Sequence, residues 1–211
     1  MSLPNNPRRP GRARLLIATG NPGKLREFEA LLGTGFVLEG LADHSEVKLP
    51  PEGTDYAANA AAKARAAARA SGLAALADDS GIEVAALGGA PGPLSARYGG
   101  GALDDAGRVR HLLAELRAHG PGATRAARFV CCAALALPSG ELHVEFGECA
   151  GEILRAPRGA GGFGYDPIFS PDAGARSMAE LTEAEKNRIS HRARALAALA
   201  PALAALARGV A

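Results

Sequence analysis

Short apolar runs alternate with helix-like patterns along the first half of the chain. Residues 14–18 and 36–41 are apolar runs of the length typical of strands. Residues 24–32 place apolar side chains at helical spacing, and an Ala-rich segment predicts a longer helix from an N-cap at Thr54 to a stop at Gly72. The first half is therefore predicted to form a strand, a helix, a strand and a second helix.

The second half contains a predicted hairpin between two helical regions. Residues 128–137 and 141–146 form the expected hairpin strands, joined by a Pro-Ser-Gly turn. A helix is expected from 104–105 to 119, and helical sequence follows a capping-box pattern at 177–180. Further strand-like segments lie at 74–77, 82–87 and 165–170.

This alternation of strands and helices around a hairpin predicts an α/β fold with a mixed sheet. A chain of 211 residues is long enough for one domain, or for one domain with two lobes, and contains no internal repeat. Residues 1–13 are polar and basic with three prolines, so we expect a flexible N-terminal tail followed by a domain at 14–211. The tail lacks the apolar stretch of a signal peptide, and no segment is long enough to span a bilayer.

Composition narrows the possible binding partners of the protein and its cellular compartment. Apolar residues make up 47% of the chain, charged residues 22%, and the net charge is only +2. Bulk charge therefore gives no reason to expect a nucleic acid or a membrane as partner. Three cysteines without a C-x-x-C pattern indicate neither a disulfide framework nor a zinc site, and buried reduced thiols are typical of a cytoplasmic protein.

The first candidate for chemistry is the turn TGNPGK at 19–24, between a predicted strand and a predicted helix. Such a junction directs backbone N–H groups and the positive helix end at a bound anion, and Lys24 adds a charge for phosphate. A Walker A loop is excluded, because Gly20 and Gly23 stand too close together and Leu25 replaces the hydroxyl residue. An ordinary tight turn is the alternative.

Two pairs of polar residues are further candidates. Asp78 and Asp79 are adjacent, and their repulsion predicts a cation such as Mg²⁺ beside them, or a carboxylate that activates water. An acidic turn is the alternative. Asn59 and Lys63 share one face of the Ala-rich helix, either in a site or in solvent.

Aromatic and basic side chains gather in two segments near the C-terminus. Residues 159–166 contain a G-x-G-x-x-G pattern, but the extended segment that follows excludes a dinucleotide-binding fold, in which a helix must follow. Phe163 and Tyr165, with glycines around them, suit stacking on a nucleotide base, which is worth roughly 1–3 kcal/mol per base. The basic segment 186–192 offers donors to a base carbonyl, or it is a solvated helix face.

These segments occur together, and in this order, in one family. The sequence resembles the Ham1/RdgB-type non-canonical purine NTP pyrophosphatases, also called inosine triphosphate pyrophosphatases, over about residues 14–207. The matching motifs are TGNPGK at 19–24, NAAAKA at 59–64, ADDSG at 77–81, GGAPG with SARY at 88–98, GGFGYDPIF at 161–169 and ELTEAEKNRISHR at 180–192.

The resemblance implies an elongated mixed sheet flanked by helices, in two lobes with a central cleft, and a homodimer. It also implies Mg²⁺-dependent hydrolysis of ITP, dITP, XTP and dXTP to the monophosphate and pyrophosphate. This reaction would cleanse the nucleotide pool and prevent incorporation of these nucleotides into DNA and RNA.

The resemblance implies roles for single residues as well. Asp79 is expected to be the metal-linked proton acceptor, with Asp78 beside it and Lys63 facing the phosphates. Substrate binding is expected from Thr19, Gly20, Asn21, Pro22, Gly23, Lys24 and Ser80, and from the base-pocket residues Phe163, Gly164, Tyr165, Asp166, Lys186, His191 and Arg192.

One departure from the family pattern concerns the metal. Acidic residues are usual two and three positions before the glycine of the loop that enters the Ala-rich helix, but Pro50 and Pro51 stand there. Either Glu52, directly before Gly53, takes over from a shifted loop, or the metal is held with fewer protein carboxylates. Glu52 is expected to bind Mg²⁺ together with Asp79. A nucleotide-binding sensor that has lost its metal ligand is one alternative function.

Base selection is expected to follow from hydrogen bonding. Hypoxanthine and xanthine present a C6 carbonyl, an acceptor for His191, Arg192 or Lys186, whereas adenine presents an amino group. A buried polar site left unpaired discriminates by about 10⁴–10⁵. The other alternative function is a Maf-like pyrophosphatase acting on pyrimidine nucleotides, against which the GGFGYDP motif and the His191-Arg192 pair argue.

Overall fold

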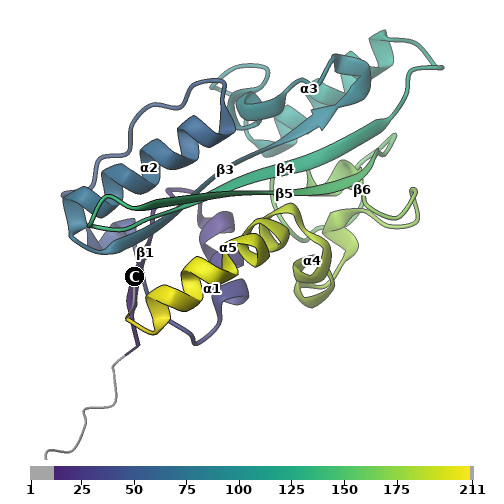
Figure 1. The fold of residues 1–211 in the computed structure, drawn as a ribbon. Helices are drawn as coiled ribbons and strands as arrows, with labels where there is room; N and C mark the ends of the chain where they lie inside the picture. Colours follow the sequence, from purple (N-terminus) through teal and green to yellow (C-terminus); the bar gives the residue numbers. More distant parts are fainter. Residues whose placement is uncertain (1–11, 210–211) are drawn as a thin grey trace, which may run out of the picture.

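The computed structural model describes residues 12–209 and contains a six-stranded sheet with helices on both faces (Figure 1). The strand order is β2-β1-β3-β4-β5-β6, in which β1 is parallel to β2 and β3 and the other neighbours are antiparallel. The strands are β1 (Arg14–Ile17), β2 (Val37–Gly40), β3 (Ala74–Val84), β4 (Ala126–Ala136), β5 (Leu142–Ile153) and β6 (Phe169–Ser170). The predicted α/β fold with a mixed sheet is confirmed.

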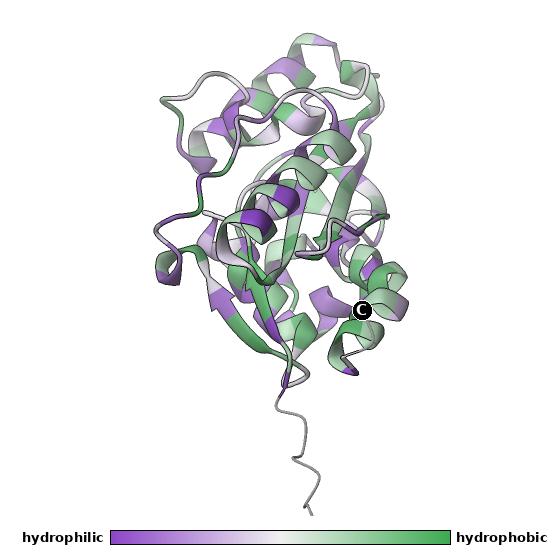
Figure 2. Cartoon of the chain, turned by 60° about the vertical axis from the view of Figure 1, so that its left-hand side comes forward, coloured by the Kyte–Doolittle hydropathy of each residue, from purple (hydrophilic) through white to green (hydrophobic). Residues whose placement is uncertain are grey.

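The helices cover the sheet from two sides. They are α1 (Pro22–Leu32), α2 (Tyr56–Ser71), α3 (Asp105–Ala118), α4 (Glu183–Ile189) and α5 (His191–Ala207). Figure 1 shows α2 on one face of the sheet and α1 and α5 on the other. The helices show a mixture of hydrophilic and hydrophobic residues in Figure 2, as expected when only one side of a helix packs against the sheet.

The core consists of three apolar clusters. Two lie on opposite faces of the sheet, and the third lies farther along β3. Leu76 and Phe28 belong to the cluster between the sheet and helices α1 and α5, and Ala60 and Ala75 belong to the cluster beneath α2. A third cluster lies beyond the end of β1 and includes Ile82, with residues of α3 and β6. β3, β4 and β5 have 11, 11 and 12 residues, whereas β1 and β2 have 4 each. The long strands β3 and β4 therefore contribute residues to all three clusters.

The strand β3 is longer than predicted. Its two apolar runs were expected to be separated by DDSG at 78–81, yet β3 continues through these residues to Val84. The reason is pairing with β4, which extends along the whole segment and aligns Asp79 with Cys132. Residues 85–87 then form a 3-10 helix instead of continuing the strand.

Two further predicted boundaries are wrong. α2 is capped by Asp55, whose Oδ1 accepts a hydrogen bond of 2.7 Å from the Ala58 N–H, and Thr54 lies one residue too early. The predicted strand at 165–170 shrinks to β6, because Asp166–Ile168 form a 3-10 turn around a proline that has no N–H to pair.

The N-terminal end of the domain is fixed to the sheet. The predicted flexible tail lies outside the described residues as far as residue 11. Arg12 Nη1 donates to the Thr34 carbonyl over 3.1 Å, and the Ala13 carbonyl accepts from the Val37 N–H over 2.9 Å. Within residues 12–209, no helix is long and apolar enough to cross a membrane.

Candidate active site

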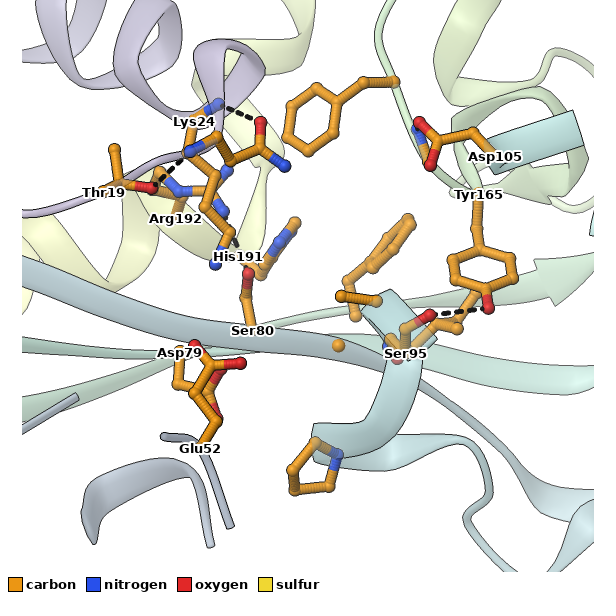
Figure 3. Close-up of a pocket in the computed structure, with 18 of the residues that line it drawn as sticks. Thr19, Lys24, Glu52, Asp79, Ser80, Ser95, Asp105, Tyr165, His191 and Arg192 are labelled. Carbon is orange, nitrogen blue, oxygen red and sulfur yellow. Dashed lines mark hydrogen bonds between the residues drawn. The ribbon is translucent and has the colours of Figure 1, made fainter. Parts of the chain in front are cut away.

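A cavity of about 290 Å³ lies where β1 ends and β3 continues alone along that edge. The backbone register pairs β1 only with residues 74–76 of β3, and the last link is a 2.8 Å bond from the Ala18 N–H to the Leu76 carbonyl. Residues 79–82 of β3 line the cavity that follows (Figure 3). The early end of β1 therefore exposes the edge of a strand that carries polar side chains.

Asp78 and Asp79 point to opposite faces of the sheet, as adjacent strand residues do. Asp79 faces α2, where Asn59 Nδ2 donates to its Oδ2 over 2.7 Å. Asp78 faces α1 and α5, where Lys24 Nζ lies 3.2 Å from its Oδ1 and Arg192 Nη2 lies 2.8 Å from its Oδ2. The prediction that the two carboxylates repel and share a cation is therefore wrong, because the sheet separates them.

The two carboxyl groups also differ in proton affinity. Burial alone would raise the pKa of Asp78, but the positive charges of Lys24 and Arg192 outweigh burial and hold that pKa well below its usual range. Burial raises the pKa of Asp79, and the hydrogen bond from Asn59 and the charge of Lys63 offset it only in part. Asp78 is thus a fixed anion inside the wall, while Asp79 is the carboxylate that faces the cavity.

The turn at 19–24 enters α1 in the predicted position. Asn21 is the N-cap, and its Oδ1 accepts from the N–H groups of Gly23 at 2.8 Å and Lys24 at 3.1 Å. Thr19 Oγ1 accepts from the Asn21 N–H over 3.1 Å. Thr19, Lys24 and the two residues after Thr19 line the cavity. The cap occupies two of the N–H groups at the start of the helix, which are then not available to an anion. An anion in the cavity would instead meet the side chains of Lys24 and Thr19.

Lys63 and Asn59 are buried on the face of α2 that meets the sheet. Each is 6% exposed, so the alternative of a solvated helix face is wrong. Lys63 Nζ forms an ion pair with Glu52 and lies 3.7 Å from Asp79 Oδ1. Glu52, Lys63 and Asp79 all line the cavity, and Figure 3 shows Glu52 beside Asp79.

The donor set around Asp79 fits a hard divalent cation. Glu52 and Asp79 supply two carboxylates, and Mg²⁺ favours one or two carboxylates together with waters and phosphate oxygens. Across residues 12–209, no group of three or more His, Cys, Asp or Glu side chains is arranged to hold an ion. An ion at this place would therefore take most of its ligands from water and a bound phosphate chain.

Glu27, which the sequence analysis missed, balances the basic residues of the cavity. This α1 residue pairs with Arg192 and lies 2.7 Å from Lys186 Nζ, which also pairs with Asp166. Lys186 and Arg192 are 6% and 1% exposed, so a solvated basic helix face is excluded. Glu27 gave no sequence signal because a helical glutamate is common and Arg192 lies 165 residues away.

Aromatic residues form the opposite end of the cavity. The Phe163 ring lies 5.0 Å from Lys186 Nζ, and the Tyr165 hydroxyl donates to the Ser95 carbonyl over 2.9 Å. Asp105 Oδ2 accepts from the Gly164 N–H over 2.9 Å and so ties this loop to α3. Phe163 lines the cavity, and its ring lies beside the buried cations Lys186 and Arg192.

His191 is a neutral, buried ring in the cavity wall. It stacks on Phe129 with ring centroids 4.8 Å apart and planes 13° apart. Its Nδ1 is buried and has no hydrogen-bond partner among the described residues. Burial, together with the charges of Arg192 and Lys186, lowers its pKa well below the usual value.

The protein is expected to lose stability as pH falls below about 6.5, by up to about 1.4 kcal/mol per pH unit from His191. The unfolded chain binds a proton there that the folded chain excludes, so stability rises with pH. The variant His191→Phe keeps a ring on Phe129 and removes the proton. Urea unfolding at pH 5 to 8 should give a difference between the two proteins that changes only below about 6.5. A difference that is constant over this whole range would contradict the buried neutral ring.

Nearly all of the predicted site residues line this one cavity. The exceptions are Pro22, Gly23 and Asp78, which do not line it. The polar lining residues that were not predicted are Ser95, Asp105 and Arg108. They come from the glycine-rich loop after β3 and from α3, and only the fold brings them to the aromatic end of the cavity.

Similar proteins share both the sequence and the fold. The sequence profile of the Ham1 family matches residues 15–202. The dITP/XTP pyrophosphatase of Deinococcus deserti is 52% identical over 188 residues, which are 88% of this chain and 87% of that protein. The protein of the same name from Mycolicibacterium paratuberculosis is 52% identical over 200 residues, which are 92% of this chain and 97% of that protein.

Solved structures agree with the sheet and its helices. A HAM1 protein from Coxiella burnetii has a TM-score of 0.81 and 40% identity, and the match covers 91% of this chain and 98% of that chain. The dITP/XTP pyrophosphatase of Mycobacterium abscessus has a TM-score of 0.70 and 46% identity, with coverage of 89% and 99%. Since the family profile and these relatives span nearly the whole domain, the chain belongs to the Ham1 family.

Proposed function

We propose that this protein is a Mg²⁺-dependent pyrophosphatase of non-canonical purine nucleoside triphosphates. It hydrolyses ITP, dITP, XTP and dXTP to the monophosphate and pyrophosphate, and so keeps these nucleotides out of DNA and RNA. The names of relatives that share half of their residues with this chain support this reaction. The observation that carries the proposal is one cavity in which phosphate donors, a carboxylate pair and an aromatic base pocket meet.

The reaction is attack of water on the α-phosphorus, with pyrophosphate as the leaving group. Asp79, the cavity-facing carboxylate with the raised pKa, accepts or orients the proton of that water. Lys63 and Lys24 stabilise the negative charge that gathers on phosphate oxygens in the transition state. Glu52 and Asp79 would hold Mg²⁺, which neutralises charge on the phosphate chain when bound.

The preference for one base over another follows from side chains that donate hydrogen bonds and cannot accept them. Lys186 and Arg192 carry only N–H donors, and their carboxylate partners fix their positions. A C6 carbonyl accepts from the N–H groups that these partners leave free, whereas the C6 amino group of adenine leaves those groups unpaired. The penalty for an unpaired buried donor supports discrimination by about 10⁴–10⁵ against ATP.

A substrate panel tests the proposal. Purified protein is incubated with ITP, XTP, ATP, GTP and CTP, with Mg²⁺ and with EDTA, and the products are identified. We expect IMP and pyrophosphate from ITP only with Mg²⁺, with ATP and CTP nearly unchanged. Turnover of CTP in preference to ITP would support a Maf-like enzyme, and tight ITP binding without turnover would support a sensor. Release of phosphate from every triphosphate would refute the base pocket.

Gly23→Ala is expected to raise KM for ITP about tenfold, since base stacking is worth roughly 1–3 kcal/mol. A Cβ at this position would lie 2.6 Å from Cδ1 of Phe163, so the ring must move out of its place in the base pocket. The helical backbone at Gly23 accepts alanine without strain. The measurement is kcat and KM, with Gly122→Ala as control, because a Cβ there meets no atom within 4 Å. An unchanged KM would argue against stacking on Phe163.

A homodimer in the cytoplasm is part of the proposal. The three free cysteines, all buried, suit a reducing compartment. The small net charge of +2 gives no support for a nucleic-acid or membrane partner. Light scattering coupled to gel filtration tests the dimer directly, and a mass of a single 21.4 kDa chain would refute it.

A further inference from the structure

We propose that Arg97 is a positioning residue that sets the Glu52 carboxylate for metal binding by clamping the backbone of its loop. The inference rests on the proposed function, because it concerns how the Mg²⁺ site is held. It also explains how a loop with prolines at 50 and 51 can present a carboxylate at residue 52.

Arg97 binds the loop through two consecutive carbonyl groups. Its Nη2 donates to the Glu52 carbonyl over 2.8 Å and to the Gly53 carbonyl over 3.0 Å, although the loop lies 45 and 44 residues earlier in the chain. A guanidinium shared by two successive carbonyls fixes the peptide between them. Since the Glu52 side chain leaves the backbone at this peptide, its direction is fixed as well.

The loop itself has few means of holding its shape. Residues 47–53 belong to no helix or strand. Pro50 and Pro51 restrict the backbone but have no N–H to donate. The loop backbone therefore depends on donors and acceptors from outside, and two side chains supply them, while Lys63 pairs with the Glu52 carboxylate.

Asn59 is the second of these side chains and connects the loop to Asp79. Its Oδ1 accepts from the Gly53 N–H over 2.7 Å, and its Nδ2 donates to the Gly53 carbonyl at 3.3 Å and to Asp79 Oδ2 at 2.7 Å. The loop is thus held by α2 on one side and by Arg97 on the other. Together the two contacts set Glu52 relative to Asp79.

Arg97 is itself on a rigid support. It ends the 3-10 helix Gly92–Arg97, in which Ser95 Oγ accepts from the Ile82 N–H at 2.9 Å and donates to the Gly92 carbonyl at 2.6 Å. Gly81 leaves no space between this helix and β3, because a Cβ there would lie 2.0 Å from the Gly92 carbonyl oxygen. The 3-10 helix that ends at Arg97 is therefore packed directly against β3, the strand that carries Asp79.

Removal of the clamp should weaken metal binding more than it slows the reaction. Groups that orient metal ligands typically change metal affinity by about 10–100-fold when mutated. With Glu52 free to move, the protein would need more metal to fill the site. At saturating metal the same Asp79 and Lys63 would act, so kcat should change little.

The test measures Mn²⁺ binding to the full-length protein by electron paramagnetic resonance, without substrate, and kcat for ITP over a range of Mg²⁺ concentrations. Arg97→Ala is expected to weaken Mn²⁺ binding by about 10–100-fold and to raise the Mg²⁺ requirement, with kcat at saturation within about twofold. Arg97→Lys should recover part of the loss, because an ammonium can donate to both carbonyls. Arg110→Ala, an exposed arginine on α3, is the control and should behave as wild type.

A double-mutant cycle separates positioning from general loosening of the fold. In a Glu52→Gln background, Arg97→Ala should cause little further loss of Mn²⁺ affinity, since both changes act on the same carboxylate. Losses that simply add, or an Arg97→Ala protein that binds Mn²⁺ like wild type, would overturn the inference while leaving the proposed function intact. Metal-independent turnover by the wild type would instead overturn the metal part of the proposed function, and this inference with it.

Discussion

Replacing Asp79 with asparagine is expected to lower kcat for ITP hydrolysis by about 10²–10⁴, the usual contribution of a general base. The amide cannot take the proton of the attacking water and is a poor ligand for Mg²⁺. Asp79 lies at the meeting point of Asn59, Lys63 and the cavity, whereas Glu83, the next carboxylate on the same face of β3, is paired with Arg128 and does not line the cavity. Single-turnover kinetics with product identification measure the effect.

Asp104→Asn is the matched control for this substitution. Asp104 caps α3 by accepting from the Gly107 N–H over 2.7 Å, and asparagine is an equally good cap. The control should keep wild-type kcat and stability. If Asp79→Asn retained more than about a tenth of wild-type kcat at saturating Mg²⁺, the assignment of Asp79 as base would be rejected.

Asp78→Asn is expected to lower the free energy of unfolding by about 3–5 kcal/mol, which is the usual cost of removing one partner from a buried ion pair. Asp78 is 1% exposed and neutralises Arg192, itself 1% exposed, together with Lys24. The amide keeps the shape of the side chain but leaves Lys24 without its counter-charge and Arg192 with Glu27 alone. Urea unfolding at pH 7 measures the loss.

The loss of stability in Asp78→Asn should depend on pH in one direction only. The pKa of Asp78 is depressed in the folded protein, so its contribution is present above its unfolded pKa of about 3.9 and is lost as pH falls toward the folded value. The difference between wild type and Asp78→Asn should therefore shrink below about pH 4. A loss under 1 kcal/mol at neutral pH would mean that water reaches the ion pair and screens it.

The two aspartates mark the limit of what the sequence could predict. Their position next to a site followed from the motif, but their separate roles depend on β3 continuing through 78–81, a segment that reads as a turn. The turn at 19–24 and the shared face of Asn59 and Lys63 were predictable because both are set by local spacing. Glu27 was not, because its partners come from the other end of the chain.

The aromatic end of the cavity also combines residues that could be predicted from the sequence with residues that could not. Phe163 and Tyr165 were recognisable by their rarity and by the glycines around them. Ser95 and Asp105 hold that loop through Tyr165 and Gly164, and although Ser95 lies in the SARY motif, nothing in the sequence indicates these contacts. Contacts between segments remote in sequence require the sheet to be known first.

The continuity of β3, β4 and β5 along the sheet limits how the two ends of the domain can move. A protein whose halves are joined by a flexible linker closes on its ligand by a hinge motion. Here the connection is three hydrogen-bonded strands of 11, 11 and 12 residues, so the two ends can approach only as far as the sheet twists. The groups that β3 contributes to the cavity therefore stay on an almost stationary platform.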